Sequence, residues 1–240
     1  GARASGRHAV RPVSGLRVAL DGPGSSGKSS VGAAAAAELG YRFLDTGIVY
    51  RAITLAAVMR DIDPTDAEAL VAVVPELQLV ADDHGNLCRV RLADEDVTDR
   101  LHVGQVDRNV SAISAQPQVR AALLERQREV AAPGDVILAG RDIGTVVLPD
   151  AELKLYLEVS AEERARRRAA QRGVAFASAE GQGILADLVR RDHLDSTREI
   201  APLQIAEDAV IVTSDGQEFA ETVAEVVRLI RHAAERTADA

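Results

Sequence analysis

Short apolar runs alternate with longer stretches of helical periodicity along most of this chain. The runs at 16–21 (LRVALD) and 135–139 (DVILA) are almost wholly apolar instead of alternating with polar residues, which is typical of strands buried on both faces of a parallel sheet. Helical segments separate successive runs, the order expected of βαβ units. The pattern therefore predicts an α/β fold with a parallel five-stranded core sheet, its strands near 16–21, 41–45, 135–139, 152–159 and 209–214.

Helix signals fill the intervals between these strands. Gly40 stands where a helix beginning after the first strand would end, in the C′ position that glycine favours. Ser160 and Glu163 have the spacing of a capping box, which starts a helix. Pro117 lies early in another helical segment, as proline does in a first turn. We expect the principal helices near 29–40, 105–132, 160–173, 178–198 and 217–235, and a further helix that begins at 46–47 and carries Tyr50 and Arg51.

Residues 61–107 differ from the rest of the chain. ELQLVA and LCRVRL flank the turn residues HGN, and DEDVT resembles a third short strand, so this segment predicts a small antiparallel insertion. It contains twelve acidic residues and three arginines, and its formal charge of −9 equals that of the whole chain. Since no calcium-loop spacing occurs, we interpret the acidity as a solvated surface.

The remaining composition excludes several classes of protein. An acidic chain makes a poor coat for nucleic acid, and no apolar run approaches the roughly 20 residues that cross a bilayer. Cys88, the only cysteine, allows no internal disulfide, and the five histidines lack metal-ligand spacing. We expect a cytoplasmic monomer with no zinc site, no membrane association and no nucleic-acid partner.

The first fifteen residues show no periodicity. They are rich in arginine, glycine and serine and contain no acidic residue. We expect residues 1–15 to be a flexible tail without a role in fold or function, and 16–236 to form a single domain.

A phosphate-binding motif follows the first strand directly. Residues 22–29 (GPGSSGKS) match G-x-x-x-x-G-K-[ST] between a strand and a helix, which is the order this motif requires. The glycines let backbone N–H groups turn toward phosphate oxygens, and the helix N-terminus adds partial positive charge. Lys28, one of only two lysines, is expected to reach the β and γ phosphates, and Ser29 to bind Mg²⁺. The expected ATP-binding residues are Gly22, Pro23, Gly24, Ser25, Ser26, Gly27, Lys28, Ser29 and Ser30.

Arginines gather in a late helical segment. From Arg164 to Arg198 the chain has eight arginines and four acids. We interpret 164–190 as an arginine-rich helical lid over a phosphoryl-transfer site, because guanidinium groups bind phosphate bidentately and stay protonated. A solvated, salt-bridged helix pair is the alternative.

Charged residues also stand just beyond two strands. Arg141 and Asp142 follow an apolar strand directly, which suits a site better than a core. Arg51 lies one helical turn after another strand. It faces either the crevice at the carboxyl edge of the sheet or solvent, and the pattern alone leaves both interpretations open.

Five segments together resemble bacterial cytidylate kinases. They are DGPGSSGKSS, LDTGIVYR, QPQVRAALLERQR, GRDIGTVVLPDA and RRDHLDSTREIAPL, and the resemblance extends from residue 16 to the C-terminal helix. It implies a three-layer P-loop kinase fold. It also implies an enzyme of pyrimidine nucleotide metabolism that uses Mg²⁺ and transfers the γ-phosphoryl group of ATP to CMP or dCMP.

The resemblance also implies roles for individual residues. Asp142 would accept a hydrogen bond from the cytosine amine, so UMP would be disfavoured by about 1 to 3 kcal/mol, roughly 10- to 100-fold. Thr46 stands where serine is common in the family. The implied acceptor-binding residues are Thr46, Arg51, Ser111, Arg120, Arg141, Asp142, Arg191, Asp195 and Arg198. The implied catalytic residues are Lys28, Arg141, Arg191, Arg198 and, among the lid arginines, Arg167.

Three other functions share parts of this pattern. Another small-molecule P-loop kinase, acting on UMP, AMP or shikimate, would have the loop and lid but not the implied base-reading residues. A regulatory P-loop GTPase would need an Asn-Lys-x-Asp segment, which this sequence lacks. A catalytically inactive binding module would be expected to lose charge at the loop or lid.

Overall fold

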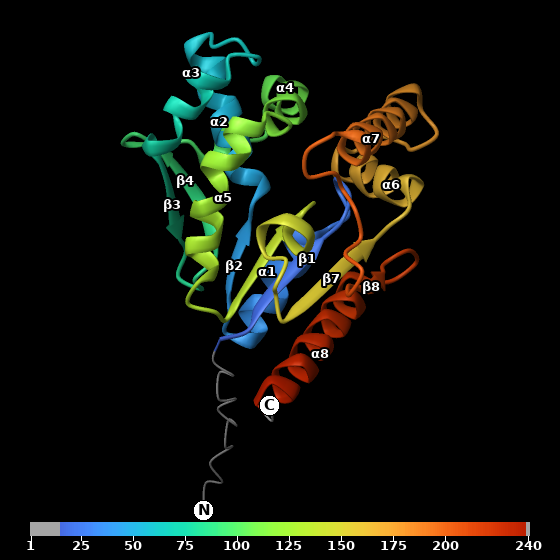
Figure 1. Ribbon diagram of the computed structural model, residues 1–240. Coiled ribbons are helices and arrows are strands. Elements are labelled where there is room, and N and C mark those ends of the chain that lie inside the picture. The colour runs from blue at the N-terminus through green and yellow to red at the C-terminus, as the bar shows by residue number, and fades with distance from the viewer. Residues whose placement is uncertain (1–14, 239–240) are drawn as a thin grey trace, which may run out of the picture.

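The computed structural model describes residues 15–238, so nearly all of the predicted tail lies outside the described residues. A five-stranded sheet in the order β2-β6-β1-β7-β8 forms its centre, and every pairing is parallel (Figure 1). This confirms the predicted core sheet. Its strands are β1 (Arg17–Asp21), β2 (Arg42–Asp45), β6 (Val136–Gly140), β7 (Leu153–Glu158) and β8 (Val210–Thr213).

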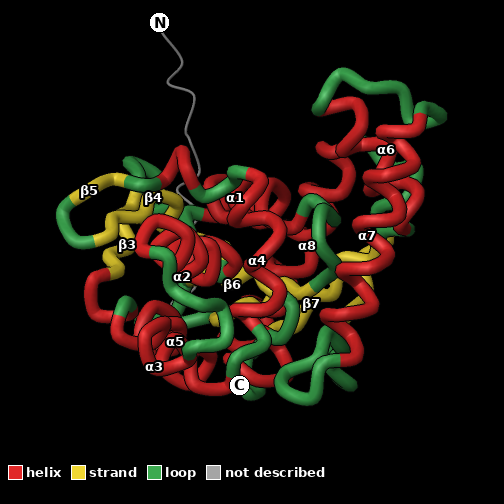
Figure 2. The backbone as a smooth tube through the Cα atoms, turned by 90° about the horizontal axis from the view of Figure 1, so that it is seen from above, coloured by secondary structure: helices red, strands yellow, loops and turns green. Residues whose placement is uncertain are grey.

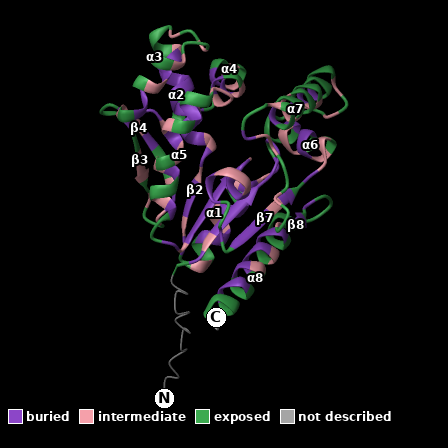
Figure 3. Cartoon of the chain, viewed as in Figure 1, coloured by how far each residue is buried: buried purple, intermediate pink, exposed green. Residues whose placement is uncertain are grey.

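Helices cover both faces of this sheet and make three layers. Val18 and Leu20 of β1 belong to the core under α1 (Lys28–Leu39) and α8 (Phe219–Ala238). Ala19, between them, belongs to the opposite core, because successive strand side chains point to opposite faces. That core lies under α2 (Gly47–Arg60), α4 (Gly104–Ser114) and α5 (Pro117–Ala131). The three central strands β6, β1 and β7 are buried along most of their length (Figure 3), which explains their continuous apolar runs. At the edge of the sheet, β8 is mostly exposed.

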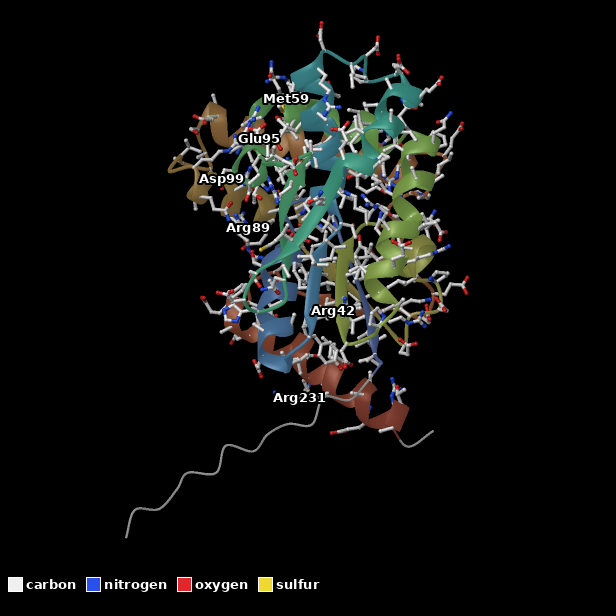
Figure 4. All side chains as sticks on the ribbon, turned by 90° about the vertical axis from the view of Figure 1, so that its left-hand side faces the viewer. Arg42, Met59, Arg89, Glu95, Asp99 and Arg231 are labelled. Atoms are coloured by element: carbon white, nitrogen blue, oxygen red, sulfur yellow. The ribbon has the colours of Figure 1, made fainter. Side chains whose placement is uncertain are left out.

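The insertion contains the predicted antiparallel sheet. Its strands are β3 (Leu77–Ala81), β4 (Leu87–Leu92) and β5 (Glu95–Asp96), in that order. A short helix that the pattern did not predict, α3 (Ala67–Ala72), precedes them. Asp94, Glu95 and Asp99 are exposed, and Figure 4 shows Glu95 and Asp99 on the outside of the insertion. The acidic segment therefore forms a solvated surface, as predicted.

The arginine-rich segment forms a helical hairpin of α6 (Ala161–Gln171) and α7 (Ala179–Thr197). Ser160 caps α6 by accepting from the backbone N–H of Glu163 at 3.2 Å, and Gly173 follows the helix in a left-handed conformation. The hairpin has a small core of its own, formed by Ala165, Ala169, Ile184 and Leu188. It projects to one side of the sheet, opposite the insertion (Figures 1 and 2).

No helix among residues 15–238 is both long enough and apolar enough to cross a membrane.

Two glycines within helices provide a test of core packing. A Cβ atom at Gly32 in α1 would lie 2.4 Å from Cε2 of buried Phe43, whereas one at Gly183 in α7 would meet nothing within 4 Å. We expect Gly32→Ala to lower the free energy of unfolding by about 1 to 3 kcal/mol through overpacking. We expect Gly183→Ala to raise it by about 0.5 to 1 kcal/mol through helix propensity.

Equilibrium urea unfolding of both variants would measure these changes. If Gly32→Ala were as stable as the wild type, this result would contradict the close packing of α1 against β2.

Candidate active site

Three neighbouring strands end beside one another at the carboxyl edge of the sheet. In β1 and β6, Asp21 pairs with Gly140, and β2 ends alongside at Asp45, opposite Ala139. The segments leaving these strands are the phosphate loop, the start of α2 and the pair Arg141-Asp142. Parallel register thus brings together residues that are up to 120 positions apart in the sequence.

The phosphate loop has a backbone that suits anion binding. Ser25 and Gly27 have positive φ angles of 61° and 91°, which turn successive N–H groups to one side of the loop. A Cβ atom at Gly22 would lie 2.7 Å from the carbonyl oxygen of Leu157, so only glycine allows this approach. Because α1 begins at Lys28, the N-terminal end of the helix points at the same place.

Lys28 is buried within this loop. Its Nζ donates to the carbonyl oxygen of Pro23 at 2.8 Å. Burial, and next the nearby Arg141 guanidinium, lower the pKa of Lys28 to about 8. The ammonium is therefore mostly protonated at pH 7 and can bind phosphate.

Ser29 pairs with a carboxylate from the neighbouring strand. Its hydroxyl donates to Oδ2 of Asp45 at 2.5 Å, while Oδ1 of Asp45 accepts from the N–H of Gly47 at 2.8 Å. A hydroxyl beside a carboxylate is the oxygen donor set that Mg²⁺ prefers in nucleotide sites. These two residues therefore fit the metal, although residues 15–238 contain no cluster of three or more His, Cys, Asp or Glu side chains arranged to hold an ion.

Arg141 connects the loop to the lid hairpin. A Cβ atom at Gly24 would lie 3.2 Å from Nη2 of Arg141, so the guanidinium lies against the phosphate loop. Its Nε forms an ion pair with Asp195 of α7, whose side chain is only 5% exposed. One side chain thus contacts both the loop and α7.

Further arginines gather beside Arg141. Arg51 donates to the Leu101 carbonyl oxygen at 2.9 Å and to Asp107 at 2.8 Å, and its side chain is 15% exposed. Burial lowers the pKa of Arg191, and the nearby guanidinium groups of Arg141 and Arg51 lower it further. Arg51 is therefore largely shielded from solvent and lies near Arg191.

Arg198 completes this group of cations. Burial is the main cause that lowers the pKa of Arg198, and the nearby charge of Arg120 lowers it further. Nε of Arg191 and Nη2 of Arg198 are buried without a hydrogen bond to any residue in 15–238. Such donors, which lie near other guanidinium groups as well as carboxylates, fit a polyanionic ligand.

A second cluster surrounds Asp142. This buried carboxylate forms an ion pair with Arg120 and lies 3.6 Å from Nη2 of Arg198. Arg120 also donates to the carbonyl oxygen of Ser114 at 3.1 Å, one helical turn from Ser111. The Arg120 guanidinium lies 5.5 Å from the centre of the Tyr50 ring. Ser111, Arg120 and Asp142 are thus in one region, together with an aromatic side chain that the sequence analysis did not single out.

Two predicted residues have their side chains engaged elsewhere. The Thr46 hydroxyl is buried at the sheet edge and donates to the carbonyl oxygen of Ala139 at 3.0 Å, so its proton is engaged by the backbone. Arg167 pairs with Glu163 at 2.9 Å and donates to the carbonyl oxygen of Ser214 at 2.7 Å. It lies near the end of β8, and none of its contacts joins it to the cluster around Arg141.

Arg164 is a residue of the site that sequence reasoning left unassigned. Its side chain is 4% exposed, pairs with Asp192 of α7 and donates to the carbonyl oxygens of Gly24 at 2.9 Å and Val159 at 3.1 Å. It therefore fixes the base of the hairpin to the phosphate loop. No local signal separates it from Arg166 or Arg168, because its partners Asp192 and Gly24 lie 28 and 140 positions away.

Known proteins resemble this chain over nearly its whole length. A family model described as Cytidylate kinase matches residues 18–232. A cytidylate kinase of Mycolicibacterium paratuberculosis is 45% identical over 219 residues, which cover 91% of this chain and 96% of the relative. One from Corynebacterium glutamicum is 42% identical over 227 residues, with 94% and 99% covered. Among solved structures, a gluconokinase from Sinorhizobium meliloti 1021 is 16% identical with a TM-score of 0.47, and 93% of this chain and 95% of that one are covered.

The arginine cluster predicts a response to anions. Because Arg191 is buried among other cations, we expect Arg191→Met to raise the free energy of unfolding by about 0.5 to 2 kcal/mol when no nucleotide is present. Pyrophosphate should stabilise the wild type by binding the folded state, and should stabilise Arg191→Met much less. Thermal unfolding with and without pyrophosphate measures both effects.

Arg190→Met is the matched control, since Arg190 is the exposed neighbour of Arg191 and pairs with Asp187 on the surface. It should respond to pyrophosphate as the wild type does. Equal stabilisation of all three proteins by pyrophosphate would contradict the proposed anion site.

Proposed function

Because the chain belongs to the cytidylate kinase family, we propose that it transfers the γ-phosphoryl group of ATP to CMP or dCMP, giving ADP and CDP or dCDP. One observation in the structure supports this most directly. Asp142, which pairs with Arg120 and Arg198, lies just after the end of β6, beside a phosphate-binding loop at the end of β1. This arrangement supports a base-reading role for Asp142 next to a site for transferable phosphate.

The donor nucleotide binds at the phosphate loop. The backbone N–H groups of the phosphate loop and the N-terminal end of α1 surround the β and γ phosphates, and Lys28 adds a positive charge. Ser29 and Asp45 would hold Mg²⁺, which would neutralise phosphate charge when bound. Arg167 and the Ser214 backbone lie farther along the same side, at the end of β8.

The acceptor phosphate binds among Arg51, Arg141, Arg191 and Arg198. The side chain of Asp195 holds Arg141 in place, which leaves the guanidinium N–H groups directed at the crevice. A phosphate monoester has its second pKa near 6 and is largely ionised at neutral pH. The attacking oxygen therefore needs no general base from the protein.

The base of the acceptor is recognised by Asp142. A carboxylate has about four lone-pair positions, so Asp142 can accept from the exocyclic amine of cytosine while it pairs with Arg120 and Arg198. Arg120 and Ser111 donate to the acceptor atoms of the base, and Tyr50 covers one side of this region. Uracil presents a carbonyl where cytosine has its amine, which would place two acceptors against each other.

Catalysis follows from alignment and charge stabilisation. Arg141 contacts the phosphate loop and α7 together, so it lies where the phosphoryl group passes from donor to acceptor. Arg191 belongs to the same cluster and adds positive charge to the equatorial oxygens. Closure of the lid hairpin excludes water, which would otherwise take the phosphoryl group.

The chain supplies all of these groups from a single copy, and we propose that it acts as a monomer. Membership of the cytidylate kinase family decides against the other interpretations of the phosphate loop, namely a kinase for a different small molecule and a regulatory NTPase.

The acceptor preference tests this assignment. With ATP and Mg²⁺, we expect CMP and dCMP to be phosphorylated with kcat/KM values about 10- to 100-fold above that for UMP, and AMP to react poorly. In Asp142→Asn, the side-chain amide can donate to the uracil carbonyl. The ratio of kcat/KM for CMP to that for UMP should therefore fall by about the same factor.

The ratio is independent of the fraction of folded enzyme, so a loss of stability in Asp142→Asn does not affect it. Equal wild-type rates with CMP and UMP would contradict the role of Asp142. An enzyme that phosphorylates neither CMP nor dCMP would contradict the proposed function.

A further inference from the structure

The residues that follow Asp142 form a π-helical turn, Ile143–Val147. The N–H groups of Val147 and Leu148 bond to the carbonyl oxygens of Asp142 at 3.1 Å and Ile143 at 2.7 Å, each five residues back. Such turns are rare and occur mostly at functional sites. The first N–H groups of any helical turn have no partner within the turn, so something else must satisfy them.

Asp21 provides both partners. Its Oδ1 accepts from the N–H of Ile143 at 2.8 Å and its Oδ2 accepts from the N–H of Gly144 at 2.7 Å. The residue is 4% exposed and is the last of β1, directly before Gly22 of the phosphate loop. A single carboxylate therefore fixes the start of the turn that Asp142 precedes.

The other end of the turn is held by a cation. Arg128 of α5 donates to the carbonyl oxygens of Val147 at 3.0 Å and Val146 at 3.2 Å. A negative charge at the amino end and a positive charge at the carboxyl end both complement the dipole of the turn.

Close packing leaves the turn little freedom. A Cβ atom at Gly140 would lie 2.6 Å from Cδ1 of Ile143, and one at Gly144 would lie 3.1 Å from Cδ of Lys154. Two glycines thus bring the turn against the sheet, where Asp21 can reach its N–H groups.

The buried Asp21 carboxylate lowers the free energy of unfolding near neutral pH. Burial raises the pKa of Asp21 to about 6, with a smaller contribution from the charge of Asp142, and the two backbone hydrogen bonds and Lys28 only partly oppose this. A group whose pKa is raised in the folded state loses stability as the pH rises from its unfolded value through 6. Because an ionised Asp21 lowers the free energy of unfolding at neutral pH, a contribution to stability does not explain why an aspartate occupies this position.

We propose that Asp21 is a positioning residue for acceptor recognition. By holding the N–H groups of Ile143 and Gly144, it sets the direction of the backbone at Asp142 and Arg141, and so the aim of both side chains. This inference rests on the proposed function, since it assigns Asp21 to the binding of CMP and not to the donor nucleotide.

Asp21→Asn is the variant that tests it. Asparagine has nearly the same shape, but its amide nitrogen cannot accept, so one backbone N–H loses its partner and faces another donor. We expect the affinity for CMP to fall by about 10- to 100-fold, as small displacements of positioned groups do. The affinity for a non-hydrolysable ATP analogue should fall much less. Titration calorimetry measures both affinities, and hydrogen exchange of residues 141–148 should become faster.

Asp82→Asn is the matched control. Asp82 also accepts from two backbone N–H groups, those of His84 and Asn86, each at 2.9 Å, but in the hairpin turn of the insertion. The affinity of the Asp82→Asn variant for CMP and the rate of hydrogen exchange of its residues 141–148 should equal those of the wild type.

The outcomes separate this inference from the proposed function. A wild type that does not bind CMP contradicts the function. A wild type that binds CMP, with Asp21→Asn binding it equally well, overturns the positioning role. An equal loss of CMP and ATP-analogue affinity with unchanged exchange of residues 141–148 would overturn it too, because Asp21 would then act on the phosphate loop.

Discussion

The active site depends on holding like charges together at one edge of the sheet. The cations there are close enough that burial and their neighbours lower the pKa values of Lys28, Arg191 and Arg198. Carboxylates from three different elements offset the repulsion: Asp107 on α4, Asp142 after β6 and Asp195 on α7. Each acid therefore fixes the direction of an arginine before any substrate binds. In the proposed mechanism, the transferring phosphoryl group meets donors that are already oriented, which is the main source of electrostatic catalysis.

The same edge explains how two phosphates can be aligned. Asp21 and Gly140 pair across β1 and β6, so the phosphate loop and the Arg141-Asp142 segment begin at neighbouring points of a rigid sheet. The Asp21 carboxylate and the Arg141 side chain then cross between the two segments in opposite directions. Arg164 fixes the base of the lid to the same loop. The lid has its own core, so it can move as a unit about a fixed base.

The sequence predicts those parts of the protein that depend on local pattern. Apolar runs locate the five parallel strands, the glycine and lysine spacing locates the phosphate loop, and the alternation in 76–92 locates the insertion sheet. The sequence pattern does not predict contacts between residues that are distant along the chain. The hydrogen bond from Ser29 to Asp45 and the two hydrogen bonds that Asp21 accepts from the π-helical turn follow from strand register. The approach of Arg120 to Tyr50 joins two helices, α5 and α2. Thr46 is among the residues predicted to bind the acceptor, and its hydroxyl donates to the Ala139 carbonyl oxygen of the neighbouring strand, a contact that no local pattern indicates.

The choice of arginine over lysine also follows from this crowding. Lys28 shows what the environment does to an amine, since its pKa falls to about 8 from an ordinary value of 10.5. A lysine at the position of Arg191 or Arg198 would have its pKa lowered in the same way, because burial and neighbouring guanidinium groups lower the pKa of both arginines. An arginine has a much higher ordinary pKa and stays protonated when it is buried. A dense cation cluster that must remain charged at pH 7 can therefore be built from arginines around one lysine, and not from lysines.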